Sequence, residues 1–331
     1  MGNKENPFDA KLYNASGQIN TTSLGYQYVI TTLSEIKARV TRQKFFEIPI
    51  SDFMPVDVGE AAWSDEIVQN REFFTGDTFE TGDVGNLDGN GRIAQVSAGL
   101  APIRMPTMTW AKHIKYSIAE IETAARGAKW DVVSAKLESL KKNWDLGIQR
   151  IAFLGHRSNK ALTGLLNNAE ATINTATITK SVSSMTAAEF QSFVATLLGV
   201  YYDNTESTAL PDTLVMPMSD LLGLGAAASP EFPVQNKIQY LTDTFRSVTG
   251  NANARILGLP YAQADRNGLG VNRYALYRND PDVLTLNIPV DFTLREVRTD
   301  MDVYWNQPAI GQYSGVLVTR PQELMYFDYS A

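Results

Sequence analysis

The sequence predicts an α+β protein in which a glycine-rich β-hairpin precedes one long helix and then a mixture of strands and helices. Three observations carry this prediction. Residues 131–155 repeat apolar side chains at helical spacing, and residues 76–99 concentrate glycine between two apolar stretches. The elements expected after residue 155 do not alternate in the regular βαβ order of a doubly wound sheet.

The composition is that of a globular protein with few catalytic side chains. The 331 residues are 44% apolar and 20% charged, which excludes a disordered, collagenous or low-complexity chain. Cys is absent, which excludes disulfides, thiolate zinc sites and cysteine nucleophiles. His occurs twice, at His113 and His156, which leaves little for a Ser-His-Asp triad. We therefore expect no enzyme, no cofactor and no metal centre.

Charge and hydropathy also limit the partners of the chain. The net charge of −7 makes it a poor candidate for binding nucleic acid by neutralising phosphates. The polar residues 1–19 do not resemble a signal peptide. No stretch approaches the ~18 apolar residues of a membrane-spanning helix, so we expect no membrane contact.

The N-terminal region is predicted to form an arm, a helix and a strand. Residues 1–28 are polar and rich in Asn, Thr and Gly, as in an arm held by a partner chain or lying on its own domain. From Tyr28 to Lys44, apolar residues recur at helical spacing and the end is basic. That basic end suits the helix dipole, and contact with an acidic surface or a phosphate is the alternative. Residues 46–50 alternate apolar and polar side chains, and Pro49 makes this an edge or bulged strand.

Residues 52–110 lack helical periodicity and predict a long β-hairpin. Apolar segments flank a stretch in which six of the 23 glycines fall within 24 residues, together with turn-forming Asp and Asn. The glycines assigned to the tip are Gly76, Gly82, Gly85, Gly89 and Gly91. A long two-stranded ribbon is only marginally stable by itself, so we expect a neighbour to support it.

The tip also resembles part of a calcium-binding loop. Asn86, Asp88 and Asn90 match the first, third and fifth positions of an EF-hand, with glycine at the sixth. The twelfth position, which requires a bidentate acid, is Ser97, and the flanks read as strands. We favour a glycine-rich hairpin tip over a calcium site.

Two helical segments are predicted between residues 113 and 155. The first begins with Ile114 and Ile118 and ends at Gly127. The second follows an N-cap at Asp131 and exceeds 20 residues, a length of about 30 Å. Its apolar stripe is expected to form the core face of a rigid spine helix. This stripe consists of Val133, Leu137, Leu140, Trp144, Ile148 and Ile151.

Helices and strands then follow one another irregularly to the C-terminus. Thr186 and Glu189 predict a capping box at the start of a helix. Further helices are predicted from Ser219 and over residues 235–245. Strands are predicted at residues 176–179, 213–216, 256–259, 273–277 and 283–288, with residues 295–305 and 316–319 as a late antiparallel pair.

The other motifs do not select a chemical site. His113 and His156 lack carboxylates at metal-ligand spacing, so we favour structural roles for both. Residues 224–229 and 268–270 do not match the glycine motifs that bind nucleotide phosphates. Four acids could in principle form a catalytic dyad but read as solvated loop acids: Asp57, Glu60, Asp65 and Glu66.

The order of these features resembles a known family. The spine helix runs through residues 143–155 into Leu-Thr-Gly-Leu-Leu-Asn at 162–167, which is similar to the helix end and "G…GLLN" of tailed-phage major capsid proteins. Residues 269–282, 288–290 and 315–321 add further likeness to the encapsulating-protein-like members. The likeness covers roughly residues 28–331 and concerns the Hong Kong 97-type fold, which encapsulin shells share.

The resemblance implies four structural parts. Residues 1–45 would be an N-terminal arm and residues 46–112 an extended loop. Residues 113–185 with 284–331 would form a peripheral domain that contains the spine helix, and residues 186–283 an axial domain. The axial loop, over residues 223–233, would meet its copies around the capsomer axis. Its marked residues are Gly223, Gly225, Pro230 and Pro233.

The resemblance also implies a function and partners. Hexamers and pentamers would close into an icosahedral virion shell around double-stranded DNA, assembled in the bacterial cytoplasm, with portal, scaffolding and decoration proteins as further partners. The short arm predicts that no scaffolding segment is cleaved from it. Residues 46–112 contain only one Lys, at Lys112, which argues against a covalent cross-link in the ribbon. An encapsulin-type shell around a cargo enzyme is the alternative, and an α+β enzyme is the third possibility.

Overall fold

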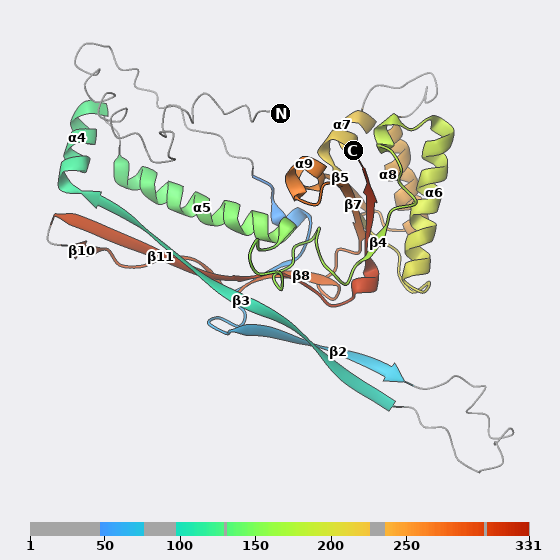
Figure 1. Ribbon diagram of the computed structural model, residues 1–331, viewed down its shortest axis with the longest axis horizontal. Coiled ribbons are helices and arrows are strands. Elements are labelled where there is room, and N and C mark those ends of the chain that lie inside the picture. The colour runs from blue at the N-terminus through green and yellow to red at the C-terminus, as the bar shows by residue number, and fades with distance from the viewer. Residues whose placement is uncertain (1–46, 76–96, 129–130, 226–235, 301–302, 331) are drawn as a thin grey trace. The chain divides into compact units, whose positions relative to one another are not determined.

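The computed structural model describes residues 47–75, 97–128, 131–225, 236–300 and 303–330 (Figure 1). The chain divides into two compact units. Among the described residues, the smaller unit comprises 111–144 and 294–309, and the larger comprises 47–110, 145–293 and the C-terminal stretch from 310.

The larger unit is built on a five-stranded mixed sheet with the order β4-β13-β7-β5-β6. Its strands are β4 (Thr172–Asn174), β5 (Thr213–Pro217), β6 (Arg255–Leu259), β7 (Asn272–Tyr277) and β13 (Leu324–Tyr329). Every residue of β5 and β13 is buried, as expected for central strands that are covered on both faces. The strands predicted at 213–216, 256–259 and 273–277 are confirmed as β5, β6 and β7.

Helices pack against this sheet and bury its main core. They are α6 (Ala187–Asn204), α7 (Met218–Leu224), α8 (Lys237–Thr249) and α9 (Ala264–Asn267), as Figure 1 shows. Short 3-10 turns lie at Ile50–Asp52, Val182–Ser184, Pro260–Ala262 and Pro321–Glu323. The predicted capping box is confirmed, because Thr186 accepts from the Glu189 backbone while the Glu189 side chain accepts from the Thr186 backbone.

A second sheet of the larger unit has the order β1-β8-β12. Its strands are β1 (Val56–Val58), β8 (Leu284–Ile288) and β12 (Val316–Val318). The predicted late pairing of residues 295–305 with 316–319 is wrong, since β12 pairs antiparallel with β8. Both strands are fully buried, and nothing in their sequences indicates which strand each would pair with.

The predicted hairpin is confirmed by β2 (Glu66–Thr75) and β3 (Ser97–Ser117), which pair antiparallel from Glu66↔Pro106 to Thr75↔Ser97. The glycine tip and the calcium-like Asn86, Asp88 and Asn90 lie outside the described residues. β2 and β3 continue a sheet with the order β10-β11-β3-β2, in which β9 also pairs with β11. The other strands are β9 (Val290–Leu294), β10 (Arg298–Asp300) and β11 (Tyr304–Ser314).

The spine helix is α5 (Val132–Leu154), and a shorter helix, α4 (Ile118–Ala128), precedes it. Asp131 caps α5 as predicted, because its Oδ1 accepts from the backbone N–H of Val133 and Ser134, each at 3.1 Å. In the predicted stripe, Leu140, Trp144, Ile148 and Ile151 are buried, and Val133 and Leu137 are half-buried.

Three local predictions are corrected. Residues 113–117 belong to β3 rather than to a helix. Ile114 is buried and Lys115 is exposed there, as in a strand whose side chains alternate between two faces. The strand expected at 46–50 is absent over the described residues 47–50, where the chain enters a 3-10 turn. The strand expected at 176–179 lies at β4 instead. The helix expected from Tyr28 lies outside the described residues.

Candidate assembly surfaces

The root of the β2–β3 ribbon is fixed by one buried amide, that of Gln312 on β11. Its Oε1 accepts from the backbone N–H of Trp63 at 2.7 Å. Its Nε2 donates to the carbonyl of Ser64 at 2.7 Å and to the Thr107 hydroxyl at 2.9 Å. Gln312 is 4% exposed, and its buried amide makes three hydrogen bonds to residues at the start of the ribbon. Sequence reasoning missed it, because nothing in the pattern around residue 312 marks a side chain that bonds 249 positions away.

An apolar cluster supports the same root. Met105, Leu162 and Leu317 form its buried core. Partly buried residues pack against them: Ile67, Ile103, Met108 and Tyr313. Farther along, Thr319 donates its hydroxyl to the Gln69 side-chain carbonyl at 3.1 Å. The first few residue pairs of the ribbon are therefore held by the body of the larger unit.

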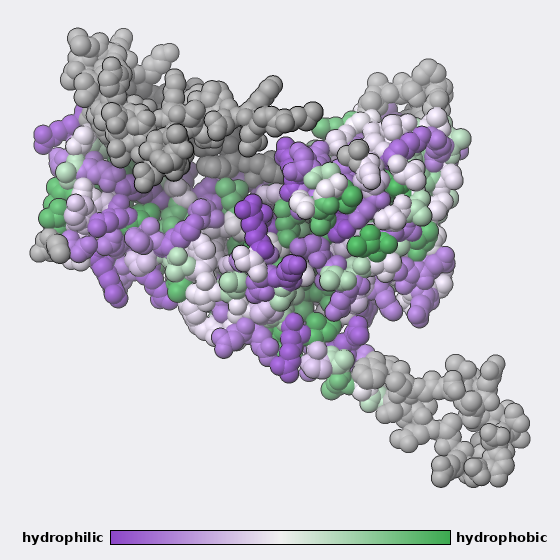
Figure 2. Space-filling view, viewed as in Figure 1, coloured by the Kyte–Doolittle hydropathy of each residue, from purple (hydrophilic) through white to green (hydrophobic). Residues whose placement is uncertain are grey.

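Beyond this root, side chains of the ribbon are exposed. Leu100 is 67% exposed and pairs with Glu72, and Val68 is 47% exposed and pairs with Arg104. Paired residues of an antiparallel ladder share a face, so these apolar side chains lie on one surface of the ribbon. Figure 2 shows apolar residues on the ribbon where it runs toward its undescribed tip. Such a surface in a single chain is typical of a part that a neighbour covers.

The end of the spine helix forms a tightly packed glycine junction. Gly155 has a φ of +69°, and a Cβ there would lie 2.4 Å from the Leu162 carbonyl oxygen. A Cβ on Gly164 would lie 2.5 Å from the Gly155 nitrogen. Asn167 locks the turn, because its Oδ1 accepts from Gly164 N–H at 2.6 Å and its Nδ2 donates to the Leu154 carbonyl at 2.7 Å. The glycines of the "G…GLLN" likeness are thus needed where two backbone segments lie too close for a Cβ. The asparagine is needed because its side chain bonds the backbone at both sides of the junction.

The predicted axial loop is described only in part. Gly223 lies against the 3-10 turn at Val182–Ser184, where a Cβ would approach Ser183 Cβ at 2.5 Å, and Gly225 ends α7. Pro230 and Pro233 lie outside the described residues. Next to Gly223 on α7, Leu222 is 71% exposed. The assignment of this loop to an axis stays a prediction.

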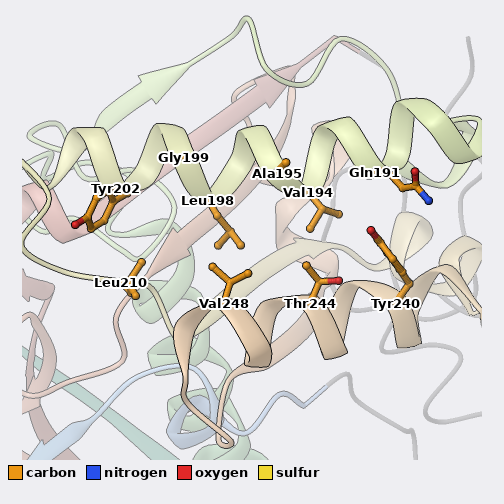
Figure 3. Close-up of a pocket in the computed structure, with 10 residues that line it drawn as sticks. All are labelled: Gln191, Val194, Ala195, Leu198, Gly199, Tyr202, Leu210, Tyr240, Thr244 and Val248. Atoms are coloured by element: carbon orange, nitrogen blue, oxygen red, sulfur yellow. The ribbon is translucent and has the colours of Figure 1, made fainter.

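An apolar groove lies between α6 and α8 (Figure 3). It has a volume of about 510 Å³. Val194 and Leu198 from α6 face Thr244 and Val248 from α8, and Tyr240 closes one end. The groove carries no ionisable acid or histidine in its lining, so it offers van der Waals contact rather than acid–base chemistry.

Several titratable side chains make hydrogen bonds that support the local structure. Burial raises the pKa of Tyr329 to about 12, and its hydroxyl donates to Asp220 at 2.8 Å. The hydrogen bond from Lys180 lowers the pKa of Glu189 to about 2. Nδ1 of His156 accepts from the backbone N–H of Asn159 at 3.0 Å, whereas His113 is exposed on β3. Tyr329 is thus tied to the core and Glu189 to a helix cap.

Metal-binding clusters and membrane-spanning helices are both absent from the described residues. No group of three or more His, Cys, Asp and Glu side chains in the described part could hold a metal ion. No helix there is both long and apolar enough to cross a membrane. The acids proposed as solvated loop residues, Asp57, Glu60, Asp65 and Glu66, lie on β1, on β2 and in the loop between them.

The solved structures that this chain resembles include phage and GTA capsids. The capsid of Myoviridae phage XM1 superposes with a TM-score of 0.73 at 15% identity, covering 90% of this chain and 97% of that chain. The capsid of a native GTA particle gives a TM-score of 0.58 at 9% identity, covering 91% and 96%. Mycobacterium phage Ogopogo gives 0.56 at 10% identity, covering 95% and 100%. The fold is therefore that of a Hong Kong 97-type capsid protein, as the sequence predicted.

The family is shown by sequence. The model of the major capsid protein family matches residues 88–329, and the chain belongs to that family. No curated protein matches the chain significantly. The chain is thus a major capsid protein of phage-type shells, a structural component of which many copies form the capsid.

Proposed function

We propose that the chain assembles into hexamers and pentamers of an icosahedral shell that encloses phage double-stranded DNA. The observation that carries the proposal is the ribbon, which leaves its root with apolar side chains exposed in a chain of the capsid family. A ribbon that crosses onto a neighbouring subunit would cover them, and repeated weak contacts would add up around a closed shell.

The net charge of −7 fits a container more than a DNA-binding protein. A shell lining that gripped phosphates would oppose packaging and release of the DNA. In this proposal many copies of the chain form a curved shell around the DNA, and the chain does not bind the bases or the phosphates. Assembly would take place in the bacterial cytoplasm, with portal, scaffolding or decoration proteins as further partners.

We retain the four-part division as part of the proposal, with one adjustment. β13 completes the sheet of β5, β6 and β7, and Met325 and Phe327 share their core. Residues 324–329 are therefore assigned with residues 186–283 to the axial domain. The glycines of the ribbon tip remain assigned to contact with a neighbouring subunit, and the axial loop to the capsomer axis.

Purified particles test the proposal. Particles that contain the chain should sediment as shells, show icosahedral order in electron micrographs and release nuclease-protected double-stranded DNA when opened. Particles filled with an enzyme in place of DNA would contradict the DNA container and support the encapsulin-type alternative. A chain that stays monomeric at every concentration and ionic strength would contradict both.

A further inference from the structure

The loop between β1 and β2, residues 59–65, holds a tryptophan in an unfavourable backbone conformation. We call it the Trp63 loop. Trp63 has a φ of +63° and Ala61 a φ of +53°. Left-handed backbone is uncommon for residues with a Cβ and an outlier for bulky ones, so it persists only where the surroundings impose it.

The surroundings do impose it. The backbone N–H of Trp63 is held by buried Gln312, and the Ser64 N–H donates to the Ala61 carbonyl at 3.1 Å. At the start of the loop, Gly59 N–H donates to the Ile288 carbonyl at 3.0 Å, which extends the β1–β8 pairing. The conformation is thus built into the fold and is not a loose surface turn.

The result of this construction is an exposed indole. Trp63 is 52% exposed, and Val58 at the other end of the loop is 56% exposed. Ala61 and Ala62 between them are exposed as well. Within the single chain, this strained loop leaves about half of a large apolar side chain in contact with water. Such strain at an exposed residue points to a contact made outside the chain.

The charge around the loop limits the partner. Residues 47–70 contain six acidic residues and no Lys or Arg. A nucleic acid or an anionic lipid surface would be repelled by this segment. A protein surface with cations at its rim would fit, and the chain carries exposed cations of its own, such as Arg157 and Lys160 after α5, which form no ion pair with a described acid.

We infer that the Trp63 loop is an anchor that docks onto a second copy of this chain in the assembled shell. This inference rests on the proposed function, which supplies neighbouring copies at fixed positions. A ring or shell is made from heterologous contacts, in which one patch of each subunit meets a different patch of the next. Buried Trp residues surrounded by a polar rim commonly dominate the binding energy of such contacts.

Substitution of the indole tests the anchor. Asn tolerates left-handed backbone, so Trp63→Asn should leave the melting temperature and circular dichroism of the subunit close to those of the wild type. We expect the concentration needed for assembly to rise at least tenfold, and Trp63→Phe to recover part of the loss. The matched control is Glu206→Asn, which places the same residue at another exposed left-handed position, with φ +53°. It should assemble like the wild type.

A thiol probe gives a second readout that does not depend on losing the indole. The chain has no Cys, so Ala62→Cys introduces a single thiol beside an intact Trp63. Iodoacetamide should label this thiol in free subunits at least ten times faster than in shells. The protection should persist in shells opened by freeze–thaw, because a thiol that merely faces the interior would then become reactive.

The outcomes separate this inference from the proposed function. If wild-type chain forms no shells, the proposed function fails and this contact fails with it. Suppose that wild-type shells form and that Trp63→Asn shells form at the same concentration. If Ala62→Cys is also labelled equally fast in shells and in free subunits, the anchor is overturned and the proposed function stands. If circular dichroism shows that Trp63→Asn misfolds, the labelling of Ala62→Cys alone decides whether the loop is buried against a neighbour.

Discussion

Arg273 and Asp328 form a buried, bidentate ion pair between β7 and β13. Arg273 Nε lies 2.7 Å from one carboxylate oxygen of Asp328, and Nη2 lies 2.6 Å from the other. The remaining Nη1 donates to the Leu166 carbonyl at 2.6 Å, which ties the sheet to the junction after the spine helix. The two side chains are only 7% and 9% exposed.

Removing one partner of this pair should destabilise the subunit strongly. Asp328→Ala leaves the Arg273 charge buried without its counter-ion, and we expect the free energy of unfolding to fall by about 3–5 kcal/mol. Denaturant unfolding of the unassembled subunit measures it. The control is Glu66→Ala, which breaks an exposed pair with Arg104 and should cost no more than about 1 kcal/mol. Equal losses in the two variants would contradict the structural role of the buried pair.

The glycine junction makes an equally specific prediction. Gly164→Ala would place a Cβ 2.6 Å from the Phe153 carbonyl carbon and closer still to Gly155, and backbone atoms cannot move aside cheaply. We expect a loss of at least about 2 kcal/mol in the free energy of unfolding.

The spine helix offers the matched control for this substitution. Gly147 lies within α5 and has nothing within 4 Å of an added Cβ, so Gly147→Ala should stabilise the subunit by up to about 1 kcal/mol. Thermal melting of both variants is the measurement. A Gly164→Ala subunit that melts at or above the wild-type temperature would show that the close approach does not exist.

Glu189 gives a pH-dependent prediction. Its pKa is lowered from 4.5 to about 2, first by the hydrogen bond from Lys180 and then by those at the N-cap. Because the pKa is lower in the folded than in the unfolded state, the stabilisation is fully present above pH 4.5 and is lost as the pH falls through about 2. Glu189→Gln should therefore be less stable than the wild type at pH 7, and the difference should shrink below pH 4.5.

Unfolding by urea across this pH range checks the sign. Glu206→Gln, which changes an exposed Glu elsewhere, serves as the control for the general effect of losing a negative charge. A difference between Glu189→Gln and wild type that stays constant from pH 7 to pH 2 would contradict the assignment.

The ribbon can be tested by shortening it. Deleting residues 76–92 removes most of the predicted tip but keeps the described strands and the Gln312 contacts at the root. We expect soluble, folded subunits that assemble poorly, because the contact with the neighbour is lost while the body of each subunit is intact. Analytical ultracentrifugation compares the two chains, and shells from the deletion at wild-type yield would show that the tip is dispensable.

Local features of this fold are predictable from the sequence. The capping box at Thr186, the N-cap at Asp131 and the strands of the hairpin all depend on residues within a few positions of one another. The same local reasoning failed at residues 113–117, where the spacing of apolar residues suits either a helix or a strand. Pairing with neighbouring strands makes this segment part of β3.

Contacts across long sequence distances were not predictable. Gln312 with Trp63, and Arg273 with Asp328, carry no spacing signal, and the fully buried β13 was not recognised as a strand of the central sheet. The strained Trp63 loop was likewise hidden, since of its three positions with positive φ only Gly59 is a glycine, whereas Ala61 and Trp63 give no such signal. The resemblance to capsid proteins predicted the fold class where periodicity could not. A family likeness implies the whole fold, including contacts between residues far apart in the sequence.

A cryo-electron microscopy map of the purified shell tests the central claim most directly. The account predicts a closed icosahedral shell in which residues 70–75 and 97–102 of each ribbon, beyond its root, lie on a neighbouring subunit, with Leu100 covered by that neighbour. Shells in which every ribbon contacts only its own subunit, or a preparation that contains monomers alone, would contradict it.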